Sequence, residues 1–475
     1  MSLVRTTALA LCFAAAACRS HPDPGTTDST GQSGSDAGVG TGAGPADGGP
    51  ADGGPVDAGP PPPDPHRIGG LGLGPWPAAP MTVYGTAQGL LEAPISASTD
   101  EAQNIWVVTG RALYLLRPGD KTFRRYTAAD GLHVGPGWTE PPDFTLVTGG
   151  RAGECFVGYY AHDTHDHTNL DPIAHLGKMD QVLLNSDLSL RVDRYDFHNS
   201  NDAHFWETRT ITSFVYDHFQ HPGELYVGSN HGVTRVQPAK FRVPSTSQER
   251  SDPTSVEREY YADHVHPVVC DVGSCTGGKD DHPVFGDFYG LTLADDGRLW
   301  MAGLTSAAAI RWTPDLQLWR NSWEPDNPFV PAMPGKGANS VFDAIYINLR
   351  AVAVTLDGTV WFASGEVESW RGPTFGLAAW RDETPYQRKF VDPRSIGAAE
   401  YNVLEMVAWD DKLVLGFPST GLLVWKPGEA RGKRLGIKEG LPGEAIGRMS
   451  LDRMVDPPQL LVPTEGGLAV LRSLP

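Results

Sequence analysis

The feature that most constrains the fold is a strand–turn–strand pattern that recurs seven times along the chain. An acidic or Gly-containing turn leads into a strand of the type (I/L/V)-W-V-x, and a small-residue turn then leads to another short apolar strand. The strands are centred on Trp106, Phe156, Tyr226, Trp300, Trp361, Val414 and Leu461. These centres are about 47 to 74 residues apart, which is typical of propeller blades that carry loop insertions.

The rest of the chain from residue 81 onward also favours an all-β fold. Its apolar runs are short, rich in Val, Leu, Trp and Tyr, and interrupted by Gly, Pro and Asp, with little helical periodicity. A chain this rich in strands must protect the edges of its sheets, and radial repetition of small sheets does so. We therefore predict one seven-bladed β-propeller of four-stranded antiparallel blades over residues 81–475.

A second pattern marks the outermost strand of a blade and predicts how the ring closes. Residues 123–127 lead to Gly131-Leu132, and residues 433–437 lead to Gly440-Leu441. A third copy, Thr82 to Thr86, stands before any inner strand, whereas the last blade stops at residues 468–471 after a third-strand pattern. We predict that the N-terminal copy is the fourth strand of the last blade and closes the ring.

The turns and exits of these blades resemble the two-component-regulator propeller repeat. Its pattern is D-x-x-G-x-(L/I)-W-(V/I)-G-T, an x-x-G-L turn and an F-x-x-Y-x-x-x-x-G-L exit. The best matches lie at residues 296–302, 357–363, 229–233, 419–422 and 123–132, and the resemblance covers most of residues 81–475. It implies an extracytoplasmic sensing domain that binds a ligand or partner. No kinase or transmembrane pattern follows the propeller here, so we expect a signalling role to need a separate partner.

The N-terminus predicts export. Residues 1–17 have a basic start and an apolar run too short to span a bilayer, and small residues precede Cys18. This resembles a bacterial lipoprotein signal, in which Cys18 carries the lipid, although Ala15 stands where Leu is usual. The alternative is an ordinary secretory signal. Both interpretations export the protein.

Residues 18–80 form a predicted linker, and its residues 19–65 are rich in Gly, Pro, Ala, Asp, Ser and Thr and have almost no aliphatic surface to bury. Such a segment cannot offset the entropy of ordering, so we expect a disordered, extended tether. It suits a lipid-anchored protein held off a membrane. We expect the globular domain in the periplasm or at the cell surface, with the outer membrane favoured over the inner.

The net charge and the cysteines limit the classes of partner and of cysteine chemistry that we expect. A formal net charge of −19 without a basic stripe argues against nucleic acid. We expect a monomeric propeller that meets a membrane through its lipid and binds an unidentified protein or small molecule. Cys155 reads as a small buried hydrophobe, and Cys270 and Cys275 are spaced for a disulfide in an oxidising compartment. A metal site would need ligands beyond that pair.

The histidines concentrate in the predicted insertions, since twelve of the fifteen fall between His162 and His282. The links between blades and the connections between second and third strands should emerge on one face, the insertion-bearing face. The densest cluster is His162, His165 and His167 in blade two. Further candidate ligand or partner contacts are His204, His231, His264, His266 and His282, of which the last three are placed in the link between blades three and four.

Two interpretations of the cluster stay open. In the first, imidazoles beside carboxylates bind a divalent transition metal, which is the cofactor that the sequence suggests. A metal with an open coordination position would support lyase or hydrolase chemistry, and streptogramin lyase is similar in its general arrangement, although no residue matches. Alternatively, His162, His165 and His167 are solvated turn residues, because no short motif fixes a geometry.

The tryptophans divide into two groups. Trp106, Trp300 and Trp361 occupy the repeated strand and are expected to pack between blades. Trp370 and Arg371 lie in an insertion and either contact a ligand or cap their own blade. We therefore expect a binding, sensing or scaffolding module rather than an enzyme, with a metal-assisted lyase or hydrolase as the alternative.

Overall fold

The computed structural model of this chain separates into two units, Met1–Asp64 and Pro65–Pro475. All the residues that the structure describes belong to the second unit, so the predicted signal, Cys18 and most of the tether lie outside them. The described residues are 76, 79–110, 112–132, 143–160, 177–197, 211–229, 232–236, 262–265, 268–269, 282–283, 288–303, 307–313, 318–321, 349–365, 376–381 and 389–474.

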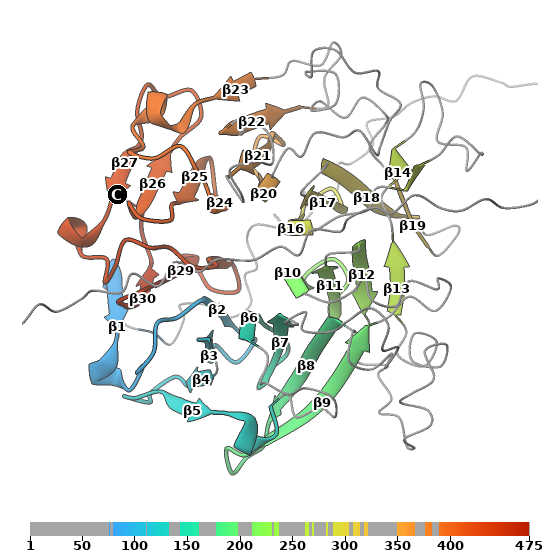
Figure 1. The fold of residues 1–475 in the computed structure, drawn as a ribbon, viewed down its shortest axis with the longest axis vertical. Coiled ribbons are helices and arrows are strands. Elements are labelled where there is room, and N and C mark those ends of the chain that lie inside the picture. Colours follow the sequence, from blue (N-terminus) through green and yellow to red (C-terminus); the bar gives the residue numbers. More distant parts are fainter. Residues whose placement is uncertain are drawn as a thin grey trace, which may run out of the picture. The chain divides into compact units, whose positions relative to one another are not determined.

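The second unit is a ring of seven four-stranded antiparallel blades, which confirms the predicted fold (Figure 1). Each blade runs outward from its innermost strand. Blades one to three are β2 (Ser96–Thr99), β3 (Ile105–Val108), β4 (Leu113–Leu116), β5 (Arg124–Tyr126); β6 (Asp143–Gly149), β7 (Glu154–Tyr160), β8 (Gly177–Leu184), β9 (Leu190–Phe197); and β10 (Ile211–Asp217), β11 (Glu224–Ser229), β12 (Gly232–Val236), β13 (Ala262–Val265).

The remaining four blades repeat this order. They are β16 (Phe288–Leu293), β17 (Arg298–Gly303), β18 (Ala307–Thr313), β19 (Leu318–Asn321); β20 (Leu349–Val354), β21 (Val360–Ser364), β22 (Leu377–Trp380), β23 (Lys389–Val391); β24 (Glu405–Trp409), β25 (Lys412–Gly416), β26 (Leu422–Trp425), β27 (Lys433–Leu435); and β28 (Ser450–Asp452), β29 (Gln459–Thr464), β30 (Gly467–Leu471), β1 (Met81–Tyr84). A separate pair, β14 (Val268–Val269) and β15 (His282–Pro283), lies in the link between blades three and four.

The core lies between neighbouring blades, because each sheet has apolar side chains on both faces. All seven predicted strand centres lie on second strands, and Trp106, Trp300 and Trp361 are buried there as expected. Trp361 meets Trp425 of the next blade edge to face, with ring centroids 5.4 Å apart. Cys155 is a buried free thiol, also as predicted. Burial of these aromatic faces is the main attraction that holds adjacent blades together.

The ring closes in blade seven as the sequence predicts. β1 pairs antiparallel with β30, and Thr82 faces Val470 in that register. The strand is slightly displaced from the predicted range, since it begins at Met81 and ends at Tyr84, and Thr86 starts the 3-10 helix η1 (Thr86–Gln88). The two ends of the propeller therefore share one sheet.

A glycine ends each of the short turns that are predicted to follow an outermost strand. The short 3-10 helices η1, η2 (Ala128–Asp130) and η7 (Ile437–Glu439) all end at a glycine with positive φ. The leucine that follows each glycine is buried. The left-handed glycine thus turns the chain so that the next leucine enters the core.

Gly131→Ala is expected to destabilise the propeller by about 1 to 2 kcal/mol through backbone strain. Gly131 has φ +96°, but an added Cβ would lie 3.7 Å from Val192, an ordinary contact. Urea unfolding measures the change. Gly110→Ala is the matched control, because Gly110 has open space around it and no positive φ, so its midpoint should stay near wild type. Equal midpoints for both variants would contradict the role of the turn.

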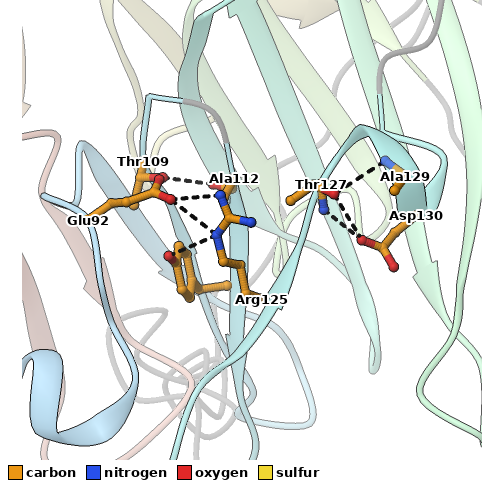
Figure 2. A network of polar contacts seen from close by, with 8 residues as sticks. Glu92, Thr109, Ala112, Arg125, Thr127, Ala129 and Asp130 are labelled. Atoms are coloured by element: carbon orange, nitrogen blue, oxygen red, sulfur yellow. Dashed lines mark hydrogen bonds and ion pairs between the residues drawn. The ribbon is translucent and has the colours of Figure 1, made fainter.

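Hydrogen bonds show that inter-blade links and second-to-third-strand turns meet on one face. Thr109, in such a turn of blade one, donates to Glu92 in the link that enters that blade (Figure 2). Arg125 also donates to Glu92, at 2.7 Å. Ser419 donates to Glu400 at the equivalent place in blade six, at 2.8 Å. In blades one and six the link and the second-to-third-strand turn therefore lie together on one face, the insertion-bearing face, as the sequence predicted.

The Glu92 carboxylate is stabilised in its charged form. Partial burial alone would raise its pKa, but hydrogen bonds from Thr109 and Arg125 hold that pKa below its ordinary value. Next to it in Figure 2, Thr127 and Asp130 cap η2, with the Thr127 amide donating to the Asp130 carboxylate at 2.8 Å. Both networks order the loops around blade one. In the part of the chain that the structure describes, no helix has the length and apolar character needed to span a bilayer.

Candidate functional site

A central cavity of about 340 Å³ runs between the innermost strands of all seven blades. These strands contact their neighbours in order around the ring, from β2 through β6, β10, β16, β20 and β24 to β28, which returns to β2. All of them start at the insertion-bearing face and end at the opposite face. The first residues of the seven strands therefore surround one entrance of the cavity.

Two glycines let the innermost strands approach closely enough to form this wall. A Cβ on Gly290 would lie 2.8 Å from the Cα of Ala351, on the innermost strand of the next blade. A Cβ on Gly447 would lie 2.3 Å from the carbonyl oxygen of Ile95. That approach allows the parallel bridge between Ser96 and Arg448, which joins blades seven and one and places Arg448 at the entrance.

Arg448 crosses the entrance and joins four blades. Its guanidinium forms an ion pair with Glu405 of blade six. It also donates to the carbonyl oxygen of Tyr289 in blade four, at 3.0 Å, and to that of Thr212 in blade three, at 3.2 Å. One side chain thus satisfies three acceptors that the closed ring brings together.

A second guanidinium lies at the same entrance. The Arg350 guanidinium carbon is 4.4 Å from the centre of the Tyr289 ring, a cation–π contact. Glu405 is almost fully buried, and burial raises its pKa above the ordinary value, although Arg448 and Arg350 act in the opposite direction. Arg350, Glu405 and Arg448 all line the cavity, and these three charged residues are named the entrance cluster.

The opposite end of the cavity has a different character. Its charged lining residues are Asp217, Asp295, Asp452 and Arg453. Asp217 accepts hydrogen bonds from the backbone amides of Phe219, Gln220 and His221, and Asp452 accepts from Gln103 and Gln459. Among the described lining residues, carboxylates therefore dominate this end, whereas Arg350, Glu405 and Arg448 lie at the entrance.

His218 also lies at the carboxylate end, packed against Tyr216 with ring centroids 4.7 Å apart. Burial lowers the pKa of His218 below its ordinary value, although Glu101, 3.4 Å from Nδ1, opposes this. The imidazole is consequently favoured in its neutral form. It makes contacts within the fold rather than adding positive charge to this end.

Most of the predicted site residues lie outside the described residues. These are His162, His165 and His167 between β7 and β8, His204 between β9 and β10, His231 between β11 and β12, His266, the pair Cys270 and Cys275, and Trp370 with Arg371 between β21 and β22. The strand ends that flank these second-to-third-strand and inter-blade segments are at the insertion-bearing face. Their roles remain predictions.

Two histidines of the link between blades three and four have a described backbone. His282 belongs to β15 and pairs with Val269 of β14, so it lies in that link as predicted. The placement of His264 in the link is wrong, because it belongs to β13 and pairs with Thr234. Residues 262–265 form the outermost strand of blade three, which pairs with its third strand, β12. Within the described residues, no group of three His, Cys, Asp or Glu side chains is arranged to hold a metal ion.

Sequence patterns did not identify the entrance cluster. Arg350, Glu405 and Arg448 are on three different blades and have no common short motif. The available signal was the innermost strand itself, where the cavity-lining residues Ser96, Leu146 and Thr212 of three other blades carry no charge. Aligning the blades on their second strands would have placed Arg350, Glu405 and Arg448 on or beside innermost strands, which line the central cavity.

No family model matches the chain. No curated protein matches it. Among solved structures, the extracellular domain assigned to a hybrid two-component system of B. thetaiotaomicron is similar at 13% identity and a TM-score of 0.48, over 83% of this chain and 42% of that one. This chain thus spans less than half of that structure.

Two further solved structures are similar over nearly their whole length. A catalytically inactive virginiamycin B lyase from Staphylococcus aureus, crystallised with quinupristin, shares 10% identity and a TM-score of 0.45 over 83% of this chain and 99% of that one. A chain of a mitotic checkpoint complex shares 12% identity and a TM-score of 0.46 over 85% and 97%. With TM-scores below 0.5, these likenesses carry no inference about this chain.

Proposed function

We propose that this protein is a lipid-anchored cell-envelope β-propeller that acts as a binding, sensing or scaffolding module through its insertion-bearing face. The observation that carries the proposal is the cavity of about 340 Å³, whose charged entrance lies at the face where the links and insertions emerge. Small-molecule sites are concave and have a few polar groups converging on an otherwise apolar wall. A cavity entrance surrounded by long insertions also suits a partner that inserts one chemical group into the ring.

A ligand screen that reads the thermal midpoint tests this function. The full-length protein is mixed with saccharides, amino acids, short peptides and organic acids, and the expected result is a midpoint increase with at least one class. Thr292→Trp, which fills the cavity from its wall, should abolish that increase. Its own midpoint without ligand controls for folding. An increase that persists in the filled variant, or none with any class, would count against cavity binding.

The anchor is tested separately through Cys18. Cys18→Ser is expected to move the protein from the membrane fraction to the soluble periplasmic fraction and to abolish labelling by a palmitate analogue, because the lipid supplies the stable membrane attachment. Cys12→Ser lies within the same predicted signal and is the matched control, so it should stay anchored and labelled. Membrane retention of unlabelled Cys18→Ser would exclude lipid anchoring through this residue.

One observation favours a metal-assisted lyase or hydrolase as a second candidate. The segment containing His162, His165 and His167 connects strand ends at the same face as the cavity entrance. For a binding module we expect untagged, periplasmically expressed protein to contain no stoichiometric transition metal by elemental analysis. One equivalent that is lost when these three histidines are changed to Ala would instead favour the metal enzyme.

A further inference from the structure

Arg453 lines the cavity at the end opposite the entrance cluster and has no ion-pair partner among the described residues. It follows β28 directly, and its guanidinium donates one hydrogen bond, to the carbonyl oxygen of Ala408 in blade six, at 3.2 Å. None of its nitrogens is a sealed, unsatisfied atom of the described core. The N–H groups that Ala408 does not engage are therefore accessible.

The charge of Arg453 is partly removed from water. Burial lowers the pKa of Arg453, whereas Asp295 of blade four and Asp410 of blade six act in the opposite direction. The guanidinium stays protonated at neutral pH, because its ordinary pKa lies above about 12. A half-buried charge without an ion-pair partner attracts a bound anion more strongly than an exposed one does, since water and salt screen it less.

The surroundings of Arg453 are apolar as well as charged. The turns between innermost and second strands surround this end, and the structure describes all seven: 99–105, 149–154, 217–224, 293–298, 354–360, 409–412 and 452–459. The apolar lining residues at this end are Phe219, Leu293, Ala294, Val354, Ala408 and Met454. Phe219 is 39% exposed, so apolar surface is open to a ligand. A concave site with an apolar wall and one charged donor suits a small amphipathic molecule.

We propose that this end of the cavity binds a monocarboxylate, whose carboxylate group pairs with Arg453 and whose apolar body lies along the cavity wall. A guanidinium binds a carboxylate through paired, charge-assisted hydrogen bonds. A dianion such as sulfate is disfavoured, because Asp217, Asp295 and Asp452 line the same end and repel its second charge. The site goes beyond the proposed function, since it lies away from the insertion-bearing face and needs none of the insertions.

Calorimetric titration of the full-length protein with hexanoate tests the assignment, with ionic strength held constant by chloride. Hexanamide is the neutral analogue, and sulfate is the dianion. We expect saturable binding of hexanoate and clearly weaker binding of both other probes. Arg453→Gln should weaken hexanoate binding by about tenfold or more, the loss typical of a charge-assisted hydrogen bond. Arg453→Lys should restore part of the affinity, because it keeps the charge without the fork.

Arg117→Gln is the matched control. Arg117 follows β4, forms an ion pair with Asp120 at 2.9 Å and is not a cavity-lining residue, so its loss should leave hexanoate affinity unchanged. The urea midpoint of each variant is measured alongside, because a purely structural role of Arg453 would make affinity follow the midpoint rather than the charge.

Three results would overturn the assignment: wild-type affinity in Arg453→Gln, equal binding of hexanamide, or no saturable binding of hexanoate. Sulfate that binds as tightly as hexanoate would refute the preference for a single negative charge. Other ligands that raise the thermal midpoint while hexanoate does not bind would leave the proposed function standing and remove only this site.

Discussion

A chain that begins at residue 86 is expected to lose cooperative folding, because it lacks β1, the outermost strand of blade seven. The deletion removes the pairing with β30 and the packing of Met81 and Tyr84 against two inter-blade clusters. Lost hydrogen bonds and lost apolar burial together cost on the order of 5 kcal/mol or more. Such a loss is comparable to the whole stability of many domains. The measurement is urea unfolding followed by tryptophan fluorescence.

Two controls separate the strand from the segment before it. A chain of residues 79–475 retains β1 but removes Trp76, which packs in the same cluster as Tyr84, so it should still unfold cooperatively but at a lower midpoint than residues 65–475. A synthetic peptide of residues 79–90 should restore cooperative unfolding to the shortened chain in trans, whereas a scrambled peptide should not. Without β1, the edge of β30 is open and is expected to promote aggregation. A cooperative transition at the normal midpoint in residues 86–475 would refute closure by this strand.

Arg448→Met is expected to destabilise the propeller by about 3 to 5 kcal/mol, the usual cost of leaving one member of a buried ion pair without its partner. The variant leaves Glu405 buried and removes the donor to Tyr289 and Thr212. The raised pKa of Glu405 rises further without the guanidinium. Above the ordinary pKa of a glutamate, Glu405 is then protonated in the folded state but ionised in the unfolded state. Because the folded state binds the extra proton, the loss of stability grows as the pH rises above about 5.

The double variant Arg448→Met, Glu405→Met supplies the control. With both members of the ion pair absent, no carboxylate remains to be desolvated, so the double variant should be more stable than Arg448→Met and should lose the pH-dependent part of the deficit. Urea unfolding of the three proteins at several pH values measures both effects. A double variant no more stable than Arg448→Met, or a deficit that does not change with pH, would show that the carbonyl contacts rather than Glu405 determine the role of Arg448.

The fold was predictable because its signals are local and repeated. One blade's second strand, such as residues 357–363, contains the turn, the aromatic core residue and the following small-residue turn in a short segment. Seven imperfect copies then reinforce one another. The closing strand was predictable for the same reason, since Thr82–Thr86 repeats the outermost-strand pattern of blades one and six. Placement failed at His264, where no repeated pattern marks the outermost strand of blade three.

The entrance cluster was not predictable in this way, because its chemistry is created by ring closure. Arg350, Glu405 and Arg448 are far apart in sequence, and Arg448 reaches acceptors in blades three and four only when all seven blades are in place. The sequence instead directed attention to His162, His165 and His167, which lie outside the described residues. Local density of one residue type is easy to see in a sequence, whereas convergence of single residues from separate repeats is not.

Closure in blade seven also sets the order of events during biogenesis. The first strand of the propeller must wait for β30, which is synthesised after the other six blades, and β30 supplies its only strand partner among the described residues. Pairing of such distant segments is intrinsically slow, because the long intervening chain must be ordered first. The ring therefore cannot close before β30 has been synthesised. Under the proposed export of this protein, the delay would keep the chain competent for secretion until β30 is available.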